Sequence, residues 1–157
     1  MRRSDREISD MKEIIEVIKK CDVCRVAFFD EDYPYILPLN FGVSYDGTNL
    51  ELYFHGAKEG KKLSLIQINP MVAFEMDCSH KLITGEIACS TTMEYESVCG
   101  NGKIEVLEEE HKVMALTQIM KQYSKETTFE FSDHELNSVT LLKLKVNQIT
   151  GKRLKKS

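Results

Sequence analysis

The alternation of apolar and polar positions predicts a series of short strands in the first half of the chain. An apolar run at 26–29 ends in the polar turn 30–32, and a long extended run covers 35–45. Asp46-Gly47 is typical of a hairpin turn, and 50–55 is its return strand. Because turn residues separate these runs, the strands are expected to pair antiparallel.

The second half of the chain continues the strand pattern. Residues 71–77 alternate, and a further strand pair is expected at 82–92 and 95–106. Gly100-Asn101-Gly102 interrupts the second strand of this pair and predicts a bulge or a sharp bend there. A closing strand is expected at 139–149, where apolar positions again alternate with others.

Three segments repeat apolar residues at helical spacing instead. The first opens at Asp10, which forms a candidate capping pair with Glu13. Its apolar face consists of Met11, Ile14, Ile15 and Ile18. The helix expected at 108–123 has an apolar stripe of Val113, Leu116, Met120 and Tyr123, widened by Met114 and Ile119. The remaining helix begins at Lys61 and ends at Asn69-Pro70, where proline stops a helical pattern.

These elements predict a mainly β (α+β) fold in a single domain over 1–157. About six or seven antiparallel strands and about three flanking helices are expected. A small antiparallel barrel closes so many short strands without leaving exposed edges. Pro38 lies inside one of these strands, and proline is confined to edges or to breaks in pairing. The segment 37–40 is therefore predicted to present unpaired backbone groups.

The two adjacent lysines at the start of the 61–68 helix are the strongest candidate for chemistry. Lys61 and Lys62 follow a loop that Gly56 and Gly60 punctuate. Lysine has the wrong sign for the positive end of the helix dipole, so the pair is unfavourable by itself. An anion would reverse this, because backbone N–H groups, the dipole and both ammonium groups would then point at one phosphate. A solvated lysine pair on a surface turn remains the alternative.

Composition and charge exclude several classes of protein. The chain has 157 residues, 42% hydrophobic content and a formal net charge of −4, which argues against generic nucleic-acid binding. No apolar stretch approaches the roughly 18 residues that a membrane span needs. The N-terminus Arg2-Arg3-Ser4-Asp5 has no apolar run behind it, so we expect no secretory signal.

The cysteines indicate a reducing compartment. There are five of them, an odd number at scattered positions, so reduced thiols and a cytoplasmic location are expected. Cys21 and Cys24 have the spacing of a redox or zinc motif, but no second pair and no suitably spaced histidine accompanies them. We therefore expect a structural or accidental origin for this spacing and no metal site.

Several motifs, taken together in order, resemble one known family. They are Leu37-Pro38-Leu39-Asn40-Phe41-Gly42, Leu52-Tyr53-Phe54-His55-Gly56-Ala57 with Gly60-Lys61-Lys62, Asn69-Pro70-Met71-Val72-Ala73-Phe74-Glu75, Tyr95-Glu96-Ser97-Val98-Cys99-Gly100-Asn101-Gly102 and Ile149-Thr150-Gly151-Lys152. Each motif is weak alone, but their order and spacing span nearly the whole chain. The set resembles the nitroimidazole-resistance (Nim-type) family of the pyridoxamine-phosphate-oxidase-like flavoproteins, which have an FMN-binding split β-barrel.

The resemblance implies FMN as the cofactor, bound at the interface of a homodimer. In such a site the 37–40 strand runs along the flavin ring, the end of the 50–55 strand passes the flavin, and the lysine pair holds the phosphate. The strand at 96–98 is expected to reach the flavin partly from the second subunit. The cofactor-binding residues implied are Leu37, Pro38, Leu39, Asn40, Phe54, His55, Lys61, Lys62, Glu96, Ser97 and Val98.

The resemblance also implies an oxidoreductase that reduces small electron-poor compounds such as nitroaromatics. The arginine-rich carboxyl end of true pyridoxamine-phosphate oxidases is missing, so vitamin B6 oxidation is not expected. His55 is either a structural histidine at a strand end or a catalytic proton donor beside the flavin. Two alternatives stay open: a non-enzymatic carrier of flavin or haem, and a split-barrel reductase that uses a deazaflavin. No Gly-x-Gly-x-x-Gly follows a strand, so a nicotinamide donor would bind only transiently.

Overall fold

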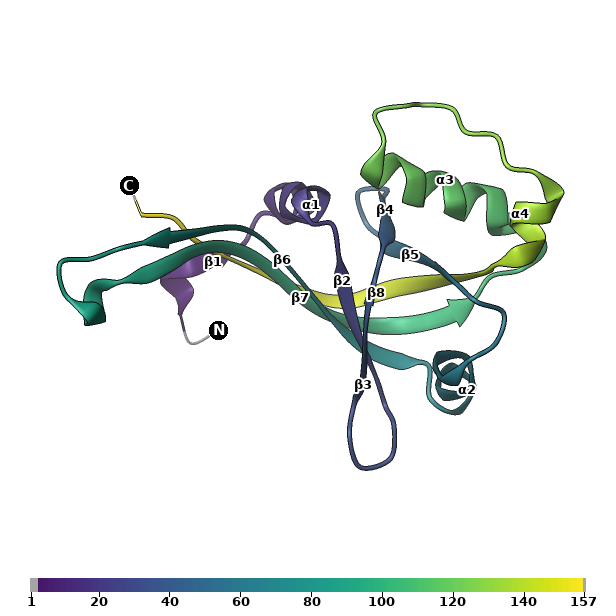
Figure 1. Ribbon diagram of the computed structural model, residues 1–157, viewed down its shortest axis with the longest axis horizontal. Helices are drawn as coiled ribbons and strands as arrows, with labels where there is room; N and C mark the ends of the chain where they lie inside the picture. Colours follow the sequence, from purple (N-terminus) through teal and green to yellow (C-terminus); the bar gives the residue numbers. More distant parts are fainter. Residues whose placement is uncertain (1–2, 157) are drawn as a thin grey trace.

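The fold is known from a computed structural model that describes residues 3–156. In that part of the chain an antiparallel sheet of eight strands carries four α-helices (Figure 1). The strands are β1 (Glu7–Ile8), β2 (Cys24–Phe28), β3 (Tyr35–Leu39), β4 (Phe41–Tyr45), β5 (Leu50–Gly56), β6 (Met71–Ile83), β7 (Thr92–Val106) and β8 (Thr140–Leu154). The helices are α1 (Met11–Lys20), α2 (Lys61–Ile68), α3 (Lys112–Tyr123) and α4 (Asp133–Ser138). The expected mainly β fold with flanking helices is confirmed, with the short β1 and α4 as additions.

The two edges of the sheet meet at a single residue. The strand order is β3-β2-β6-β7-β8-β5-β4, with β1 also paired to β8, so β3 and β4 are the outermost strands of this path. Only Asn40 separates them in the sequence. The extended run expected at 35–45 is therefore two strands, because the chain crosses from one edge to the other at Asn40. The sheet rolls into a barrel. Its two outer strands, β3 and β4, do not pair with each other and are linked only through the backbone of Asn40.

The position of Pro38 agrees with its chemistry. Pro38 lies on β3, which pairs only with β2, and it faces Arg25 in that ladder. One side of β3 has no partner strand, so a proline, which lacks the backbone N–H, is tolerated there, as expected for an edge strand.

The barrel interior is filled by large apolar side chains from nearly every strand. The largest fully buried ones include Phe28, Phe41, Phe54, Leu52, Met76, Ile104, Leu142 and Leu144. Helix α1 covers one end of the barrel with Ile14, Ile15 and Ile18, as expected, together with Val17. Asp10 caps this helix by accepting a hydrogen bond from the Lys12 N–H. The reciprocal pairing with Glu13 was wrong, because the Glu13 carboxylate binds Arg153 instead.

Helix α3 buries only part of the apolar stripe that its sequence predicts. Ile119 is buried, whereas Val113, Met120 and Tyr123 are all more than a third exposed. Ala115, outside the predicted stripe, is also buried. A Cβ atom on Gly42 of β4 would overlap the backbone of α3 at Ile119, so the helix lies directly against this strand.

The hairpin of β6 and β7 forms an arm that extends beyond the barrel (Figure 1). The strand expected at 82–92 was wrong, because residues 84–91 form the turn of this arm and the strands pair as 71–83 with 92–106. Serine and threonine side chains hydrogen-bond locally there, as Ser90 does with Ile87, and hold the turn. The bulge expected near Gly100-Asn101-Gly102 is confirmed by a register shift between β7 and β8.

Candidate functional site

Helix α2 begins in a conformation that only glycine adopts readily. Gly60, the residue before the helix, has a φ of 135°, which L-residues rarely adopt. No side chain of the described residues caps this helix, and no acidic residue lies in its first turn. The backbone N–H groups and the dipole of the first turn are therefore available to an anion.

Lys61 connects the start of α2 to the β2–β3 hairpin. Its Nζ lies 2.6 Å from Oδ2 of Asp30 and 5.3 Å from the centroid of the Tyr35 ring. The hydrogen bond to Asp30 raises the pKa of Lys61 above its ordinary value. Since Tyr35 begins β3, these contacts bring the predicted phosphate-binding lysine next to the predicted flavin strand.

Lys62 lies on the other side of the helix start, over the end of β5. A Cβ atom placed on Gly56 would be only 2.5 Å from Nζ of Lys62, so the ammonium group rests against the Gly56 backbone. His55 precedes this glycine, is exposed and pairs with Leu141 of β8. Phe54, by contrast, is fully buried in the core, so a flavin could meet it only through backbone atoms.

Strand β3 presents alternating faces to the core and to the outside. Leu37 and Leu39 are half-buried and pack against the core, while Pro38 and Asn40 are exposed. The Asn40 side-chain amide donates to the carbonyl of Asp22 at 3.3 Å. Near the β2–β3 turn lies a mainly apolar hollow of about 240 Å³. Its lining residues are Ala27, Phe28, Phe29, Asp30, Glu31, Asp32, Tyr33, Pro34 and Ala73.

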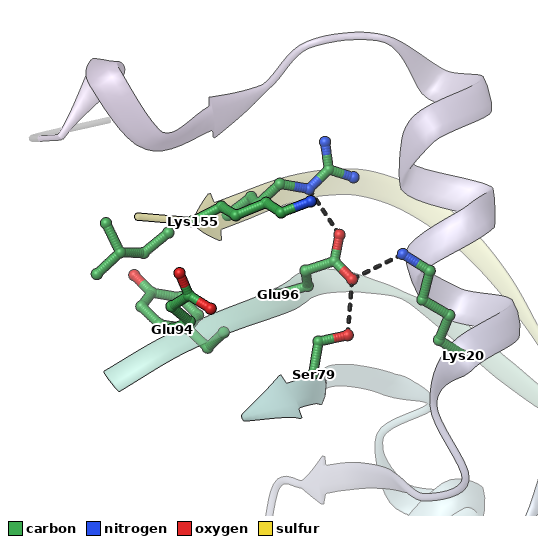
Figure 2. A pocket seen from close by; sticks show the side chains of 8 residues that line it. Lys20, Ser79, Glu94, Glu96 and Lys155 are labelled. Atoms are coloured by element: carbon green, nitrogen blue, oxygen red, sulfur yellow. Dashed lines mark hydrogen bonds and ion pairs between the residues drawn. The ribbon is translucent and has the colours of Figure 1, made fainter. Parts of the chain in front are cut away.

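Glu96 is the first residue of the 96–98 stretch. It is nearly buried and forms the centre of an ion cluster at the root of the arm (Figure 2). Its carboxylate accepts hydrogen bonds from Nζ of Lys20 at 2.7 Å, Oγ of Ser79 at 2.8 Å and Nε of Arg153 at 2.6 Å. Burial alone would raise the pKa of Glu96. The bonds from Lys20, Ser79 and Arg153 outweigh burial and lower the pKa to about 2. The cluster holds α1, β6, β7 and β8 together.

The other two residues of the 96–98 stretch differ in how accessible they are to a ligand. Val98 is fully buried in the core, and Ser97 is half-buried between Asp77 and Lys152 in the neighbouring strands. A cavity of about 360 Å³ adjoins the ion cluster. It is lined by Lys20, Ser79, Glu94, Tyr95, Glu96, Arg153, Leu154 and Lys155.

The predicted site residues thus fall into two groups. The structure brings the start of α2, strand β3 and the end of β5 together through Asp30, Tyr35 and Gly56. Residues 96–98 lie at the root of the arm, and the Glu96 side chain is fully engaged there. From the sequence, residues 30–32 were predicted only to form a turn, and the role of Asp30 as the partner of Lys61 was missed. The available signal was charge complementarity with the lysine pair.

The Cys21-x-x-Cys24 spacing does not produce a pair of facing thiols. Cys24 points into the core, whereas Cys21 lies beside Cys78 of β6, and both approach the carbonyl of Val17. Burial foremost raises the pKa of the Cys21 and Cys24 thiols, which makes them poor nucleophiles. Over residues 3–156 no group of three or more His, Cys, Asp or Glu side chains is arranged to hold a metal ion.

Residues 10–153 match the sequence profile of the family described as pyridoxamine 5'-phosphate oxidase. The chain belongs to this family. A solved structure from Bacteroides thetaiotaomicron, of a candidate 5-nitroimidazole antibiotic resistance protein, is 36% identical, with a TM-score of 0.80. The alignment covers 94% of this chain and 86% of that one. The resemblance to the nitroimidazole-resistance proteins is therefore confirmed.

Two further solved structures share the fold at low sequence identity. An FAD- and haem-binding protein of Mycobacterium smegmatis has a TM-score of 0.80 at 17% identity, over 96% of this chain and 74% of that one. A flavocytochrome of Azotobacter vinelandii has a TM-score of 0.79 at 14% identity, over 99% of this chain and 72% of that one. A comparison with curated protein sequences found no match. None of the helices in the described residues is long and apolar enough to cross a membrane.

Proposed function

We propose that this protein is an FMN-binding flavoprotein that reduces small electron-poor compounds such as nitroaromatics. The observation that carries the proposal is the uncapped start of α2 in a member of this family, where Lys61 adjoins strand β3 and Lys62 adjoins the end of β5. The 36% identity to a candidate nitroimidazole-resistance protein supports the substrate class. A cytoplasmic location is part of the proposal and is supported by the odd number of cysteines.

The residues present fit a phosphate-bearing flavin. Lys61 and Lys62 would hold the phosphate as two point charges, without the planar fork that arginine offers. The N–H groups of the first turn of α2 would add hydrogen bonds to the same phosphate. The exposed outer side of β3 would meet the ring through backbone groups, since its Pro38 lies at the sheet edge. When bound, the flavin supplies the electron transfer, and the protein supplies position and charge.

His55 is the proposed proton donor. It is exposed at the end of β5, directly before the Gly56 backbone that Lys62 covers. As a nitro group is reduced its oxygens gain negative charge, and a well-placed donor lowers the barrier by about 2.7–4 kcal/mol. Imidazole can carry that proton near neutral pH.

A second copy of the chain is proposed to complete the site. The hollow near the β2–β3 turn measures about 240 Å³, below the roughly 300–1,000 Å³ of small-molecule sites. Large apolar side chains are exposed around it, including Phe29, Tyr33 and Ile36, and exposed apolar surface of this kind marks interfaces. Ser97 is the residue proposed to reach the flavin from the partner. Sedimentation of the flavin-loaded protein at micromolar concentration should give twice the chain mass, and a loaded monomer would contradict the dimer.

The function is tested by stopped-flow reoxidation of the pre-reduced, flavin-loaded protein by a nitroimidazole. His55→Ala should retain bound flavin and slow this step about 100-fold or more, as loss of one such donor does. His80→Ala is the matched control, because His80 is a half-exposed histidine that binds Asp77 on the arm. Equal rates in wild type and His55→Ala would leave His55 a structural residue.

The same samples test the cofactor and the reaction class. Their absorption spectrum distinguishes flavin from a deazaflavin and from haem. Reoxidation by oxygen without any reoxidation by nitro compounds would favour a carrier over a nitroreductase.

A further inference from the structure

The two lysines at the start of α2 are not equivalent in the folded protein. The Lys61 side chain is 54% exposed, and its ammonium group forms an ion pair of 2.6 Å with Asp30, whose side chain is only 20% exposed. In the described residues no ion pair involves Lys62, whose ammonium group rests against the backbone of Gly56. One of the two candidate phosphate ligands is therefore already engaged by an anion of the same chain.

The anion that holds Lys61 belongs to a fixed turn. Asp30 follows β2, and its carbonyl accepts a hydrogen bond from the Tyr33 N–H at 3.0 Å, which closes the turn. Glu31 and Asp32 add two more carboxylates to it. Tyr35 lies under the same ammonium group, so Lys61 is held between an acidic turn and an aromatic ring.

A phosphate that binds at this helix start must share Lys61 with Asp30 or displace it. In the first case a dianion approaches a carboxylate within a few ångströms, where like charges repel. In the second case the ion pair that Lys61 forms with the phosphate is offset by the ion pair that it breaks with Asp30. In both cases Lys61 contributes less to the affinity for the phosphate than its position indicates. Lys62 has no competing carboxylate among the described residues, so its contribution is not reduced in this way.

We propose that Asp30 competes with the cofactor phosphate for Lys61 and thereby sets how tightly the flavin is held. This inference rests on the proposed function, since it assigns the start of α2 to the flavin phosphate. It makes the cofactor exchangeable, and it makes Lys62 the principal phosphate ligand. Asp30 acts as an affinity-determining residue that need not touch the flavin ring.

The proposal is tested by titrating FMN into the cofactor-free protein and its variants, with flavin fluorescence as the readout. Asp30→Asn should tighten FMN binding about three- to tenfold, the range expected from removing one partly exposed ion pair and its repulsion. Asp32→Asn removes a charge from the same turn without touching Lys61 and should change the affinity less than about twofold, as expected for a screened charge. Lys62→Met should weaken binding more than Lys61→Met does.

A double-mutant cycle shows whether Asp30 acts through Lys61. In a Lys61→Met background Asp30→Asn should tighten FMN binding less than it does in wild type, because only the repulsion between Asp30 and the phosphate is left to remove. Asp30→Ser provides a second variant should the asparagine disturb the turn, and thermal melting confirms that each variant folds. Unchanged or weaker FMN binding in both Asp30 variants, with wild-type binding intact, would overturn the competition. A wild-type protein that binds no flavin would instead overturn the proposed function.

Discussion

Two cations lie near one carboxylate at two places in this molecule, but only at one of them are both cations bound by it. At the root of the arm one nearly buried carboxylate, Glu96, receives bonds from Lys20, Arg153 and Ser79. At the start of α2 Asp30 binds Lys61, whereas no ion pair of the described residues involves Lys62, which rests against Gly56. The Glu96 carboxylate has no oxygen left for a ligand, whereas the ammonium group of Lys62 is available to an anion.

The surroundings of the two places reinforce this difference. The Glu96 side chain is only 10% exposed, against 20% for Asp30, although its partners Lys20 and Arg153 are 49% and 32% exposed. Arg153 also binds Glu13 of α1, which extends the cluster to a second carboxylate. The Lys61–Asp30 pair lies at the surface, where solvent and salt weaken it. We conclude that the Glu96 cluster stabilises the fold, and the contrast supports the proposal that the start of α2 binds a phosphate.

The largest expected effect concerns the start of α2. Replacing Lys61 and Lys62 together by alanine should weaken FMN binding about 100-fold or more, because charge-assisted hydrogen bonds to the phosphate are lost. The melting temperature should stay close to that of wild type. Lys121→Ala with Lys125→Ala removes two exposed lysines near the end of α3 and serves as the control in the same titration. Unchanged FMN affinity in the Lys61 and Lys62 double variant would remove the phosphate site from α2.

A smaller effect, on stability, is expected from the Glu96 cluster. Glu96→Gln keeps the size of the side chain but leaves Lys20 without its anion and Arg153 with Glu13 alone, at a cost of about 2 kcal/mol. For a chain of this length the melting temperature should fall by about 4–8 °C. FMN affinity should not change. A large loss of FMN affinity would show that Glu96 contacts the flavin after all and would break the contrast between the two clusters.

The smallest effect is a pH dependence of the same cluster. The pKa of Glu96 is about 2 in the folded protein against an ordinary value of 4.5, so the unfolded chain binds more protons between these values. Its contribution to stability is therefore complete above about pH 5 and is lost as the pH falls through 4.5 toward 2. Urea unfolding of wild type and Glu96→Gln at about pH 6, 4 and 3 should show a stability difference that shrinks with acidity. If the difference in unfolding free energy between wild type and Glu96→Gln did not change with pH, Glu96 would not have the lowered pKa.

Local patterns were sufficient to predict most elements of the fold. An apolar run predicted β2 and alternation predicted β5, each within one or two residues of its observed bounds. Helical spacing and the following proline predicted both ends of α2 as observed. The buried face of α3 was predicted only in part, with Ile119 right and Val113 wrong, because an apolar stripe alone does not say what the helix packs against. The absence of a side chain at Gly42 decides that, and Gly42 lies on a distant strand.

The site was predictable only in part, for a similar reason. The lysine pair and β3 each carry a local signal: a basic helix start and a proline within a strand. The contacts that give these residues their character, Lys61 with Asp30 and Glu96 with Arg153, join segments far apart in the sequence. Which carboxylate meets which cation depends on sheet register, and hydrophobic alternation fixes the face of a strand but not its partner.

The place of β8 in the sheet has a consequence for how the chain folds during synthesis. The strand pairs with β1, β5 and β7, and the β4–β5 hairpin has no other neighbour in the described sheet. Helix α3 packs on that hairpin, and the two can join the rest of the sheet only once residues 140–154 have left the ribosome. Until then β5 and β7 are open edges, which invite aggregation. The pairing of β8 covers both edges at once.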